Sequence, residues 1–402
     1  MGNDPSPGRT GGAHPTMRDV AALAGVGVMT VSRVVNDRGG VSPERAVRVR
    51  QAIEKLDYRH NVTARHLRLT GQSTATIGVL LEDIANPFAA ELLRAVENVM
   101  SKQDCLVLCA SSDGDAAREK ALLSAFCARR VDGLIIVPCG PDHRYLLPEV
   151  RRGTQVVFAD RPAPSVAADM VISDNFGGAR LAVTHLLRSG HTRIGFLSDL
   201  RGIYTAAERH RGYLDALARA GIEPDERLIR RDIHSAPSAE QATHDLLIAR
   251  PAPTAIFTAQ NLLTMGARMA LRSMGAERTI AHVGFDDIPL AGLVDPGITV
   301  IAQDPPAMGT LAAQMLLHRI RDPNGAPETV QVPTRLLARG SGEIAPPQCG
   351  QNALWPAADI VPAAGEEPHV RRKSHTSAGR AAHRYSPLRS AERPTDEIDR
   401  AR

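Results

Sequence analysis

From Thr76 onward the chain repeats one pattern that restricts its fold: short, continuously apolar segments alternate with stretches of helical periodicity over about 230 residues. The apolar segments are IGVLL, CLVLCA, GLIIVP, QVVFAD, VISD, RIGFLSD, AIFTAQ, IAHVGFDD and TVIAQD. Strands that are apolar on both faces belong to parallel sheets covered by helices on both sides. Because the repeat is long enough for two sheets, we predict an α/β body made of two doubly wound lobes.

The segment before this body has the pattern of short helices. RDVAALA predicts a helix that Gly25 ends, and VMTVSRVVN predicts a second helix after a turn of about three residues. This second helix buries valines on one face and presents the other face to a partner, with Met29, Thr30, Arg33 and Asn36 on it. A third helix in VSPERAVRVRQAIEKL, with Ser42 placed to cap it and Pro43 in its first turn, completes a small core through Ala46, Val49, Ile53 and Leu56. This arrangement is typical of a helix-turn-helix, whose second helix enters the major groove of DNA.

Charge is concentrated in the same region. Residues 17–75 contain ten Arg or Lys and five Asp or Glu, whereas the whole chain has a formal net charge of only +4 at pH 7. Such a concentration is the electrostatic footprint of a module that binds phosphates. A three-helix cap on a larger domain is the alternative, and the coincidence of basic charge with exposed reading positions favours DNA binding over it.

The helical region is joined to the body by a short basic segment, NVTARHLR, followed by LTGQSTA. Eight residues are too few for a stable isolated helix in water, so we expect the segment to fold on DNA. Leu67 is then the apolar side chain available to unstack a base step in the minor groove, with Arg65 and Arg68 near phosphates. An ordinary linker whose Leu docks on the next domain is the alternative.

Taken together, RDVAALAGVGVMTVSRVVN, VSPERAVRVRQAIEKLDYRHN and ARHLR resemble the DNA-binding end of the LacI/GalR family of bacterial transcription regulators. By position, the resemblance implies base reading by Val28, Met29 and Arg33, phosphate contacts by Thr30, Ser32 and Asn36, and a minor-groove wedge at Leu67. The chemistry agrees for Arg33, whose planar fork can bond guanine O6 and N7, whereas Val28 and Met29 offer only apolar contact. The chain departs from the family where Gly27 replaces a usual Ser and His60 a common Pro.

Polar residues follow the predicted strands of the body at their carboxyl ends, where doubly wound sheets bind ligands. These residues are Asp83, Asn86, Asp160, Arg161, Asp174, Gln260, Asp286 and Gln303. We therefore expect them to converge on a ligand site.

Residues from about 76 to 341 also resemble the effector domain of the same family, which is similar to periplasmic sugar-binding proteins. The motifs that carry this resemblance are DIANPF, FADRP, DNFGGARLAVTHLLRSGHTRIGF, ERHRGY and VGFDDIPLA. By position it implies effector contacts by Phe88, Asp160, Arg209, Gln260, Asp286 and Gln303. Two departures argue against a simple sugar: Gln260 and Asn261 replace a usual Asn-Asp pair, and Ile233 and His234 stand where many members carry an aromatic ring.

The predicted organisation is multidomain: an all-α helix-turn-helix DNA-binding domain plus an α/β two-lobe, periplasmic-binding-protein-like effector domain. We expect a disordered tail at 1–15, the helix-turn-helix at 16–60, a hinge helix and linker at 61–75, the effector-binding and dimerisation domain at 76–342, and a disordered tail at 343–402. The last segment shows no heptad pattern, so a homodimer is expected rather than a tetramer built on a coiled coil.

Several classes of protein are disfavoured. No apolar run reaches the roughly 18 residues of a membrane span, and no signal peptide is evident, so we expect a cytoplasmic, nucleoid-associated protein. The five cysteines form no CxxC pair, which predicts reduced thiols, no metal site and no cofactor.

The leading hypothesis is a sequence-specific repressor that binds double-stranded operator DNA and is controlled by a small-molecule effector such as a sugar or a related metabolite. An enzyme on the same frame would need a nucleophile with a base, paired catalytic carboxylates or a metal cluster, and no such spacing is present. An architectural DNA-binding protein without effector control is the third class, and a footprint spread uniformly over DNA would identify it.

Overall fold

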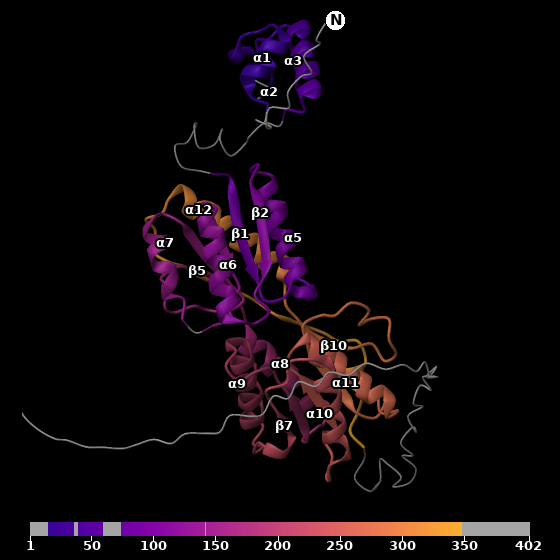
Figure 1. Cartoon of the computed structure of the whole chain (residues 1–402). Coiled ribbons are helices and arrows are strands. Elements are labelled where there is room, and N and C mark those ends of the chain that lie inside the picture. Colours follow the sequence, from indigo (N-terminus) through magenta and orange to yellow (C-terminus); the bar gives the residue numbers. More distant parts are fainter. Residues whose placement is uncertain (1–14, 36–38, 59–73, 141, 348–402) are drawn as a thin grey trace, which may run out of the picture. The chain divides into compact units, whose positions relative to one another are not determined.

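Two six-stranded sheets, each covered by helices on both faces, make up most of the chain in a computed structural model (Figure 1). The structure describes residues 15–35, 39–58, 74–140 and 142–347. The predicted α/β body of two lobes is confirmed. Among the described residues, no helix is long and apolar enough to cross a membrane.

The first lobe contains a sheet in the order β11-β5-β4-β3-β1-β2, and every neighbouring pair in it is parallel. Its strands are β1 (Thr76–Leu81), β2 (Leu106–Ser111), β3 (Gly133–Ile136), β4 (Gln155–Ala159), β5 (Asp169–Ser173) and β11 (Thr329–Val332). Strands β1, β3 and β4 are almost entirely buried, as their continuous apolar sequences predict.

The second lobe contains a sheet in the order β12-β10-β9-β8-β6-β7, which is parallel except where β12 pairs with β10. Its strands are β6 (Ile194–Leu197), β7 (Ile229–Arg230), β8 (Ala255–Thr258), β9 (Ala281–Phe285), β10 (Thr299–Ala302) and β12 (Arg335–Leu337). The sequence did not predict β7, β11 or β12, because they are short and only partly apolar.

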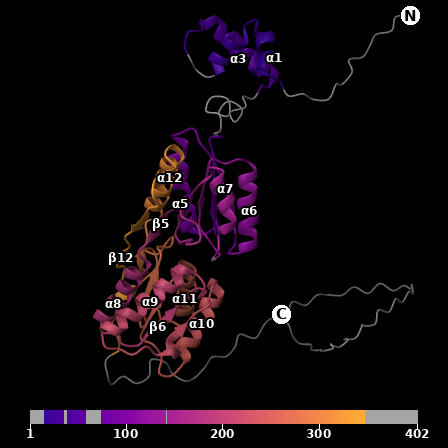
Figure 2. The same ribbon diagram turned by 90° about the vertical axis from the view of Figure 1, so that its left-hand side faces the viewer.

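Helices cover both sheets on both faces (Figure 2). In the first lobe they are α5 (Pro87–Ser101), α6 (Ala116–Ala128), η1 (Arg144–Leu146), α7 (Leu147–Arg151) and α12 (Pro305–Arg321). In the second lobe they are α8 (Asn175–Arg188), α9 (Tyr204–Arg219), η2 (Glu226–Leu228), α10 (Ala236–Ile248), α11 (Asn261–Ser273) and η3 (Ser341–Glu343). Each sheet face therefore has its own apolar core. In the first sheet one core lies under α5 and α12 and the other under α6, and in the second sheet one lies under α8 and α9 and the other under α10 and α11.

The chain passes between the lobes three times, at residues 173–175, 302–305 and 332–335. Helix α8 follows β5 yet packs on the second sheet, and α12 follows β10 yet packs on the first. Each lobe is consequently assembled from separate stretches of sequence, and the strand ends of both lobes face the region near the crossings.

The ordered body is longer at both ends than the predicted boundaries of 76 and 342. Thr74 donates its backbone N–H to Asp132 Oδ1 (2.7 Å) and its hydroxyl to the carbonyl of Arg130 (2.9 Å). At the other end, Glu343 accepts from the Thr299 hydroxyl (2.8 Å), and the carbonyl of Ile344 accepts from the His191 ring (2.7 Å). The predicted tail at 343–402 therefore begins too early, since residues 343–344 belong to the second lobe.

The N-terminal helices are α1 (Met17–Ala24), α2 (Val28–Val35) and α3 (Pro43–Leu56). Thr16 and Asp19 form a capping box at the start of α1, and Gly25 ends it in the left-handed region (φ 63°). Val20, Val31 and Val49 are fully buried in a shared core, which confirms the predicted three-helix packing. Ser42 lies at the predicted capping position of α3, but its side chain makes no capping hydrogen bond.

His282 on β9 makes the stability of the second lobe depend on pH. The ring is fully buried, its Nε2 lies 2.9 Å from the Thr258 hydroxyl, and burial lowers its pKa from 6.5 to about 3. In the unfolded chain His282 therefore binds a proton below pH 6.5, whereas in the folded lobe it stays neutral down to about pH 3. We expect His282 to cost about 1.4 kcal/mol of stability per pH unit within that window.

The measurement is urea unfolding at several pH values between 7 and 4, compared with a His282→Gln variant. The variant should be less stable at pH 7 but show a shallower loss as the pH falls. Parallel pH profiles for the two proteins would contradict the assignment.

Candidate functional site

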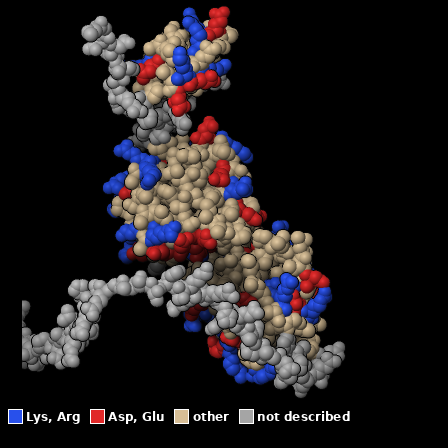
Figure 3. Space-filling view, turned by 45° about the vertical axis from the view of Figure 1, so that its right-hand side comes forward, with Lys and Arg blue, Asp and Glu red and all other residues tan. Residues whose placement is uncertain are grey.

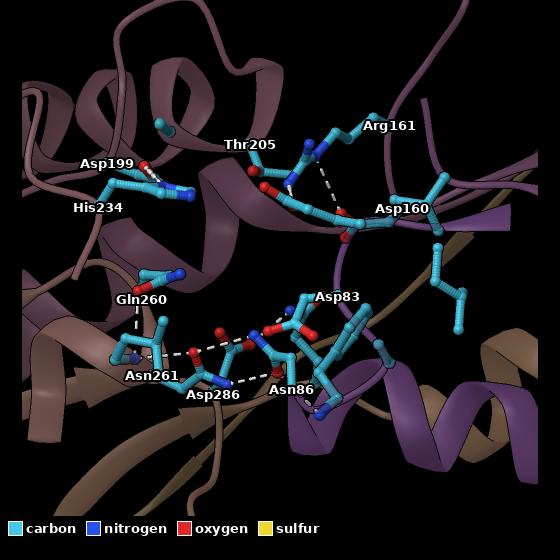
Figure 4. Close-up of a pocket in the computed structure, with 18 of the residues that line it drawn as sticks. Asp83, Asn86, Asp160, Arg161, Asp199, Thr205, His234, Gln260, Asn261 and Asp286 are labelled. Carbon is cyan, nitrogen blue, oxygen red and sulfur yellow. Dashed lines mark hydrogen bonds and ion pairs between the residues drawn. The ribbon is translucent and has the colours of Figure 1, made fainter. Parts of the chain in front are cut away.

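A polar cleft of about 210 Å³ lies between the carboxyl ends of the two sheets (Figure 4). All six residues that the family resemblance assigned to effector contact line this one cleft: Phe88, Asp160, Arg209, Gln260, Asp286 and Gln303. They come from both lobes and are up to 215 positions apart in sequence, from Phe88 to Gln303. The polar residues predicted at strand ends, apart from Asp174, line the same cleft, so their expected convergence is confirmed, while their contact with an effector stays a prediction.

Asp160 and Asp286 occupy equivalent positions in the two lobes. Each follows a central strand, β4 or β9, and each has a backbone in the left-handed region, with φ of 67° and 69°. Their N–H groups donate to the carbonyls of Val171 and Ile301, at 2.8 Å in both cases. Aspartate tolerates this conformation better than most residues, and here it ends each strand at the cleft.

Arg209 on α9 is buried and held from three sides. Its Nε donates to Asn175 Oδ1 (2.8 Å), and its Nη1 donates to the carbonyl of Ala259 (2.8 Å) and lies 3.8 Å from Asp286 Oδ2. The guanidinium also lies 3.8 Å from the centroid of the Phe285 ring. Burial lowers the pKa of Arg209 and raises that of Asp286, while the two charges oppose both shifts.

The first lobe supplies a second buried group of charges. Arg161 is paired with Glu82 and lies 3.3 Å, from Nε to Oδ2, from Asp160. Burial raises the pKa of Asp160, an effect that Arg161 and Arg209 oppose. Asp160, Arg161 and Arg209 thus belong to one electrostatic system that spans the cleft.

His234 and Asp199 form a pair on the side of the second lobe. His234 Nδ1 lies 2.7 Å from Asp199 Oδ1, which also accepts the N–H of Leu200 (2.7 Å). This hydrogen bond raises the pKa of His234. In Figure 4 the pair faces Asp160 and Arg161 from the opposite wall. Asp199 was not predicted as a site residue, although it closes the apolar segment RIGFLSD at a strand end.

Four further polar residues line the cleft that the sequence did not predict as site residues, and one residue predicted there, Asp174, lies outside the cleft. Glu82, Asp113, Thr205 and Asn261 line the cleft without having been predicted to. The expectation that Asp174 converges on the site is wrong, because Asp174 caps α8 by accepting the N–H of Gly177 (2.8 Å). Asp174 lies where the chain crosses between the lobes, and its side chain caps α8 instead of lining the cleft.

The cleft carries an excess of negative charge. Six carboxylates line it, from Glu82, Asp83, Asp113, Asp160, Asp199 and Asp286, against the guanidinium groups of Arg161 and Arg209 and the imidazole of His234. Both guanidinium groups already lie beside carboxylates. No cluster among the described residues has the His, Cys, Asp and Glu arrangement of a metal site.

On the N-terminal helices, the positions predicted to read bases are open to solvent. Val28, Met29 and Arg33 are exposed on α2, with 71% of Met29 accessible, while Thr30 and Ser32 are half-buried. The carbonyl of Gly27 accepts the N–H of Thr30 (2.8 Å), so Gly27 starts the helix despite lacking a capping side chain. Two predicted contacts, Asn36 and Leu67, lie outside the described residues, as does the predicted hinge segment at 61–68.

Comparison with known proteins gives a consistent result. Residues 16–61 match the model of bacterial regulatory proteins of the lacI family, and residues 183–342 match a periplasmic binding protein-like domain. The chain is 34% identical over 332 residues to the ribose operon repressor of Escherichia coli K12, which covers 81% of this chain and 99% of that protein. It is 32% identical over 311 residues to the transcriptional repressor PurR of Aliivibrio salmonicida, covering 76% and 92% of the two chains.

Solved structures of transcription regulators are also similar to this chain. The lac repressor dimer bound to operator and the anti-inducer ONPF superposes with a TM-score of 0.70 at 27% identity, covering 82% of this chain and 99% of that one. The complex of the regulator CelR with cellobiose gives a TM-score of 0.61 at 30% identity, covering 82% and 100%.

A helix-turn-helix joined to a two-lobe body with a polar cleft is the architecture of a DNA-binding transcription regulator controlled by a small molecule. The chain belongs to the LacI family of bacterial regulatory proteins.

Proposed function

We propose that this regulator is a homodimeric repressor that acts in the cytoplasm at the nucleoid and is controlled by an uncharged sugar of monosaccharide size. The observation that carries the effector class is the charge of the cleft. Six carboxylates line the cleft against two guanidinium groups and the His234 imidazole, and each of these cations already lies beside a carboxylate, which disfavours an anionic ligand. Carboxylates and Arg forks bond well to hydroxyl groups. Phosphorylated sugars and organic acids are therefore disfavoured.

The size of the cleft restricts the effector further. A volume of about 210 Å³ is below the range of roughly 300–1,000 Å³ of drug-sized ligand sites, which favours a single sugar ring over a disaccharide. The name of the ribose operon repressor supports a pentose as the first compound to test.

Two departures from the family argued against a simple sugar, but neither excludes one. The amides of Gln260 and Asn261 can still donate to and accept from hydroxyl groups. His234 is no evidence for an acidic effector, because it is already paired with Asp199.

The DNA-binding proposal rests on the exposed face of α2. Val28, Met29 and Arg33 would contact base edges, and Thr30, Ser32 and Asn36 would contact phosphates. Leu67 would act as the minor-groove wedge of the hinge. A symmetric dimer places two such helices on a pseudo-palindromic operator.

Two exposed apolar surfaces support the homodimer. Strand β2 is an edge strand with the sequence LVLCAS, and 61% of its Leu106 is exposed. Figure 3 views the molecule from this side and shows a broad central area of that lobe with few charged side chains. In the second lobe Leu290 and Leu293 are exposed on a loop that Arg268 ties to α11 through the carbonyls of residues 295 and 296. We assign both surfaces to the contact between two copies.

Thermal unfolding of the full chain tests the effector class with D-ribose, D-ribose 5-phosphate and cellobiose. A ligand that binds only the folded state stabilises it by RT ln(1 + [L]/Kd), about 2.7 kcal/mol at a hundred times Kd. We expect an uncharged monosaccharide, with D-ribose tested first, to raise the Tm, and D-ribose 5-phosphate not to do so at the same concentration.

The control is Asp215→Ala, which removes a surface ion pair with Arg219 outside the cleft and should leave the Tm shift intact. A larger shift from the phosphorylated sugar than from any uncharged monosaccharide would overturn the proposed effector class.

A further inference from the structure

Asn86 and Asn261 meet across the cleft and exchange hydrogen bonds. Asn261 Nδ2 donates to Asn86 Oδ1 (2.8 Å), and Asn86 Nδ2 donates to Asn261 Oδ1 (3.4 Å). Figure 4 shows the two amides between the walls of the cleft. Asn86 belongs to the first lobe and Asn261 to the second, and 175 positions separate them in sequence. We call this pair the asparagine clasp.

Each member of the clasp is also tied to the start of a helix in its own lobe. Asn86 Oδ1 accepts the N–H of Phe88 (3.1 Å) and caps α5, and Asn261 Oδ1 accepts the N–H of Leu262 (2.8 Å) at the start of α11. These helices pack in the apolar cores of different lobes. Movement of one amide relative to the other therefore requires movement of one lobe relative to the other.

Within the part of the chain that the structure describes, the clasp supplies the direct hydrogen bonds across the cleft away from the three chain crossings. The remaining attraction between the walls is longer-range, between Arg209 and Asp160 and between Arg161 and Asp199. Asn261 is 98% buried, so its amide is costly to separate from its partner without another hydrogen bond.

We propose that the asparagine clasp holds the two walls of the effector cleft at the spacing that this structure shows before any effector binds. Asn86 and Asn261 are positioning residues in this role. Their uncharged amides matter because at least one of the two groups must donate, which two facing carboxylates cannot do. Asn261, where the family usually has a carboxylate, is the residue that permits the exchange. The proposal depends on the two-lobe cleft and not on the identity of the effector.

Aspartate substitutions separate the clasp from the helix caps. In Asn86→Asp the new carboxylate can still cap α5 and accept from the Asn261 amide. In Asn261→Asp the new carboxylate can still accept the N–H of Leu262 and the amide of Asn86. In the double variant two carboxylates face each other with no donor between them, and they repel. Each single variant keeps one amide donor in the clasp, so we expect its effector-free cleft to open little more often than that of the parent chain, whereas the double variant should open the cleft.

Hydrogen exchange of the full-length, effector-free protein measures this opening through amides in residues 82–90 and 258–264. In the double variant exchange should rise by about tenfold in both segments, with the buried strands β3 and β9 unchanged. The matched control is Asn86→Asp with Gln260→Glu, which adds the same two charges at the same two helix starts without opposing Asn86. Its effects should equal the sum of its single variants.

The result that overturns the proposal is a double aspartate variant whose exchange equals the sum of its singles, or rises only in the segment that carries each substitution. If circular dichroism shows that this variant does not fold, the two single alanine variants and the double alanine variant test the proposal instead. Asn86→Ala or Asn261→Ala alone already removes the clasp, so the double alanine variant should exchange little faster than the faster single. Additive effects would then refute the clasp. No effector is needed, so the outcome is independent of the sugar tests.

Discussion

Replacing Asp286 with alanine should abolish the Tm shift caused by any effector and should destabilise the second lobe by about 3 to 5 kcal/mol. The side chain is buried, lies 3.8 Å from Arg209 Nη1 and accepts a hydrogen bond from Gln303 Nε2. Alanine leaves the buried guanidinium without its nearest carboxylate in the second lobe and leaves the amide without an acceptor. The free energy of unfolding from urea titrations and the Tm with and without D-ribose measure the two effects.

Asp286→Asn is the matched control for this change. The amide oxygen can still accept from Gln303, so this variant should be more stable than Asp286→Ala while still losing most of the effector response. Operator affinity without effector should survive in both variants below their unfolding temperatures, because the cleft alters only the balance between body conformations. Loss of DNA binding by a variant that remains folded would assign Asp286 to the coupling with DNA instead.

Replacing Arg33 with alanine should weaken binding to the specific operator by about 1 to 3 kcal/mol, or roughly 5- to 150-fold, with much less effect on random DNA. Among the proposed base-reading positions, Val28 and Met29 offer only apolar contact, whereas Arg33 presents a rigid fork of donors from an exposed position on α2. The measurement is competition binding with operator and random duplexes at one fixed salt concentration, since salt alone changes such affinities strongly.

Arg33→Lys is the control, because it preserves the charge and removes the fork. If Arg33 reads a guanine, lysine should recover nonspecific binding fully but operator affinity only in part. Equal losses on operator and random DNA for Arg33→Ala, with full recovery in Arg33→Lys, would mean that Arg33 contacts a phosphate.

Much of the candidate site could be predicted from sequence, because the chemistry of single positions follows local pattern. The continuous apolar segments identified the central strands, and residues after them, such as Asp160 and Asp286, were expected at a ligand site and line the cleft. The valines of α2 indicated its buried face and so identified Arg33 as exposed. Asp174 shows the weakness of the rule, since its place after β5 resembles the others but leads into a helix cap.

The sequence by itself determined the two-lobe α/β body, the helix-turn-helix and the strand ends that carry polar groups, because alternation of burial within a few residues decides each element. Only the tertiary structure decided which groups meet. Arg209 with Asn175, His234 with Asp199, and Asn86 with Asn261 join positions 34, 35 and 175 residues apart. No local periodicity encodes such distances, because they depend on three chain crossings and on how separate helices pack against two sheets.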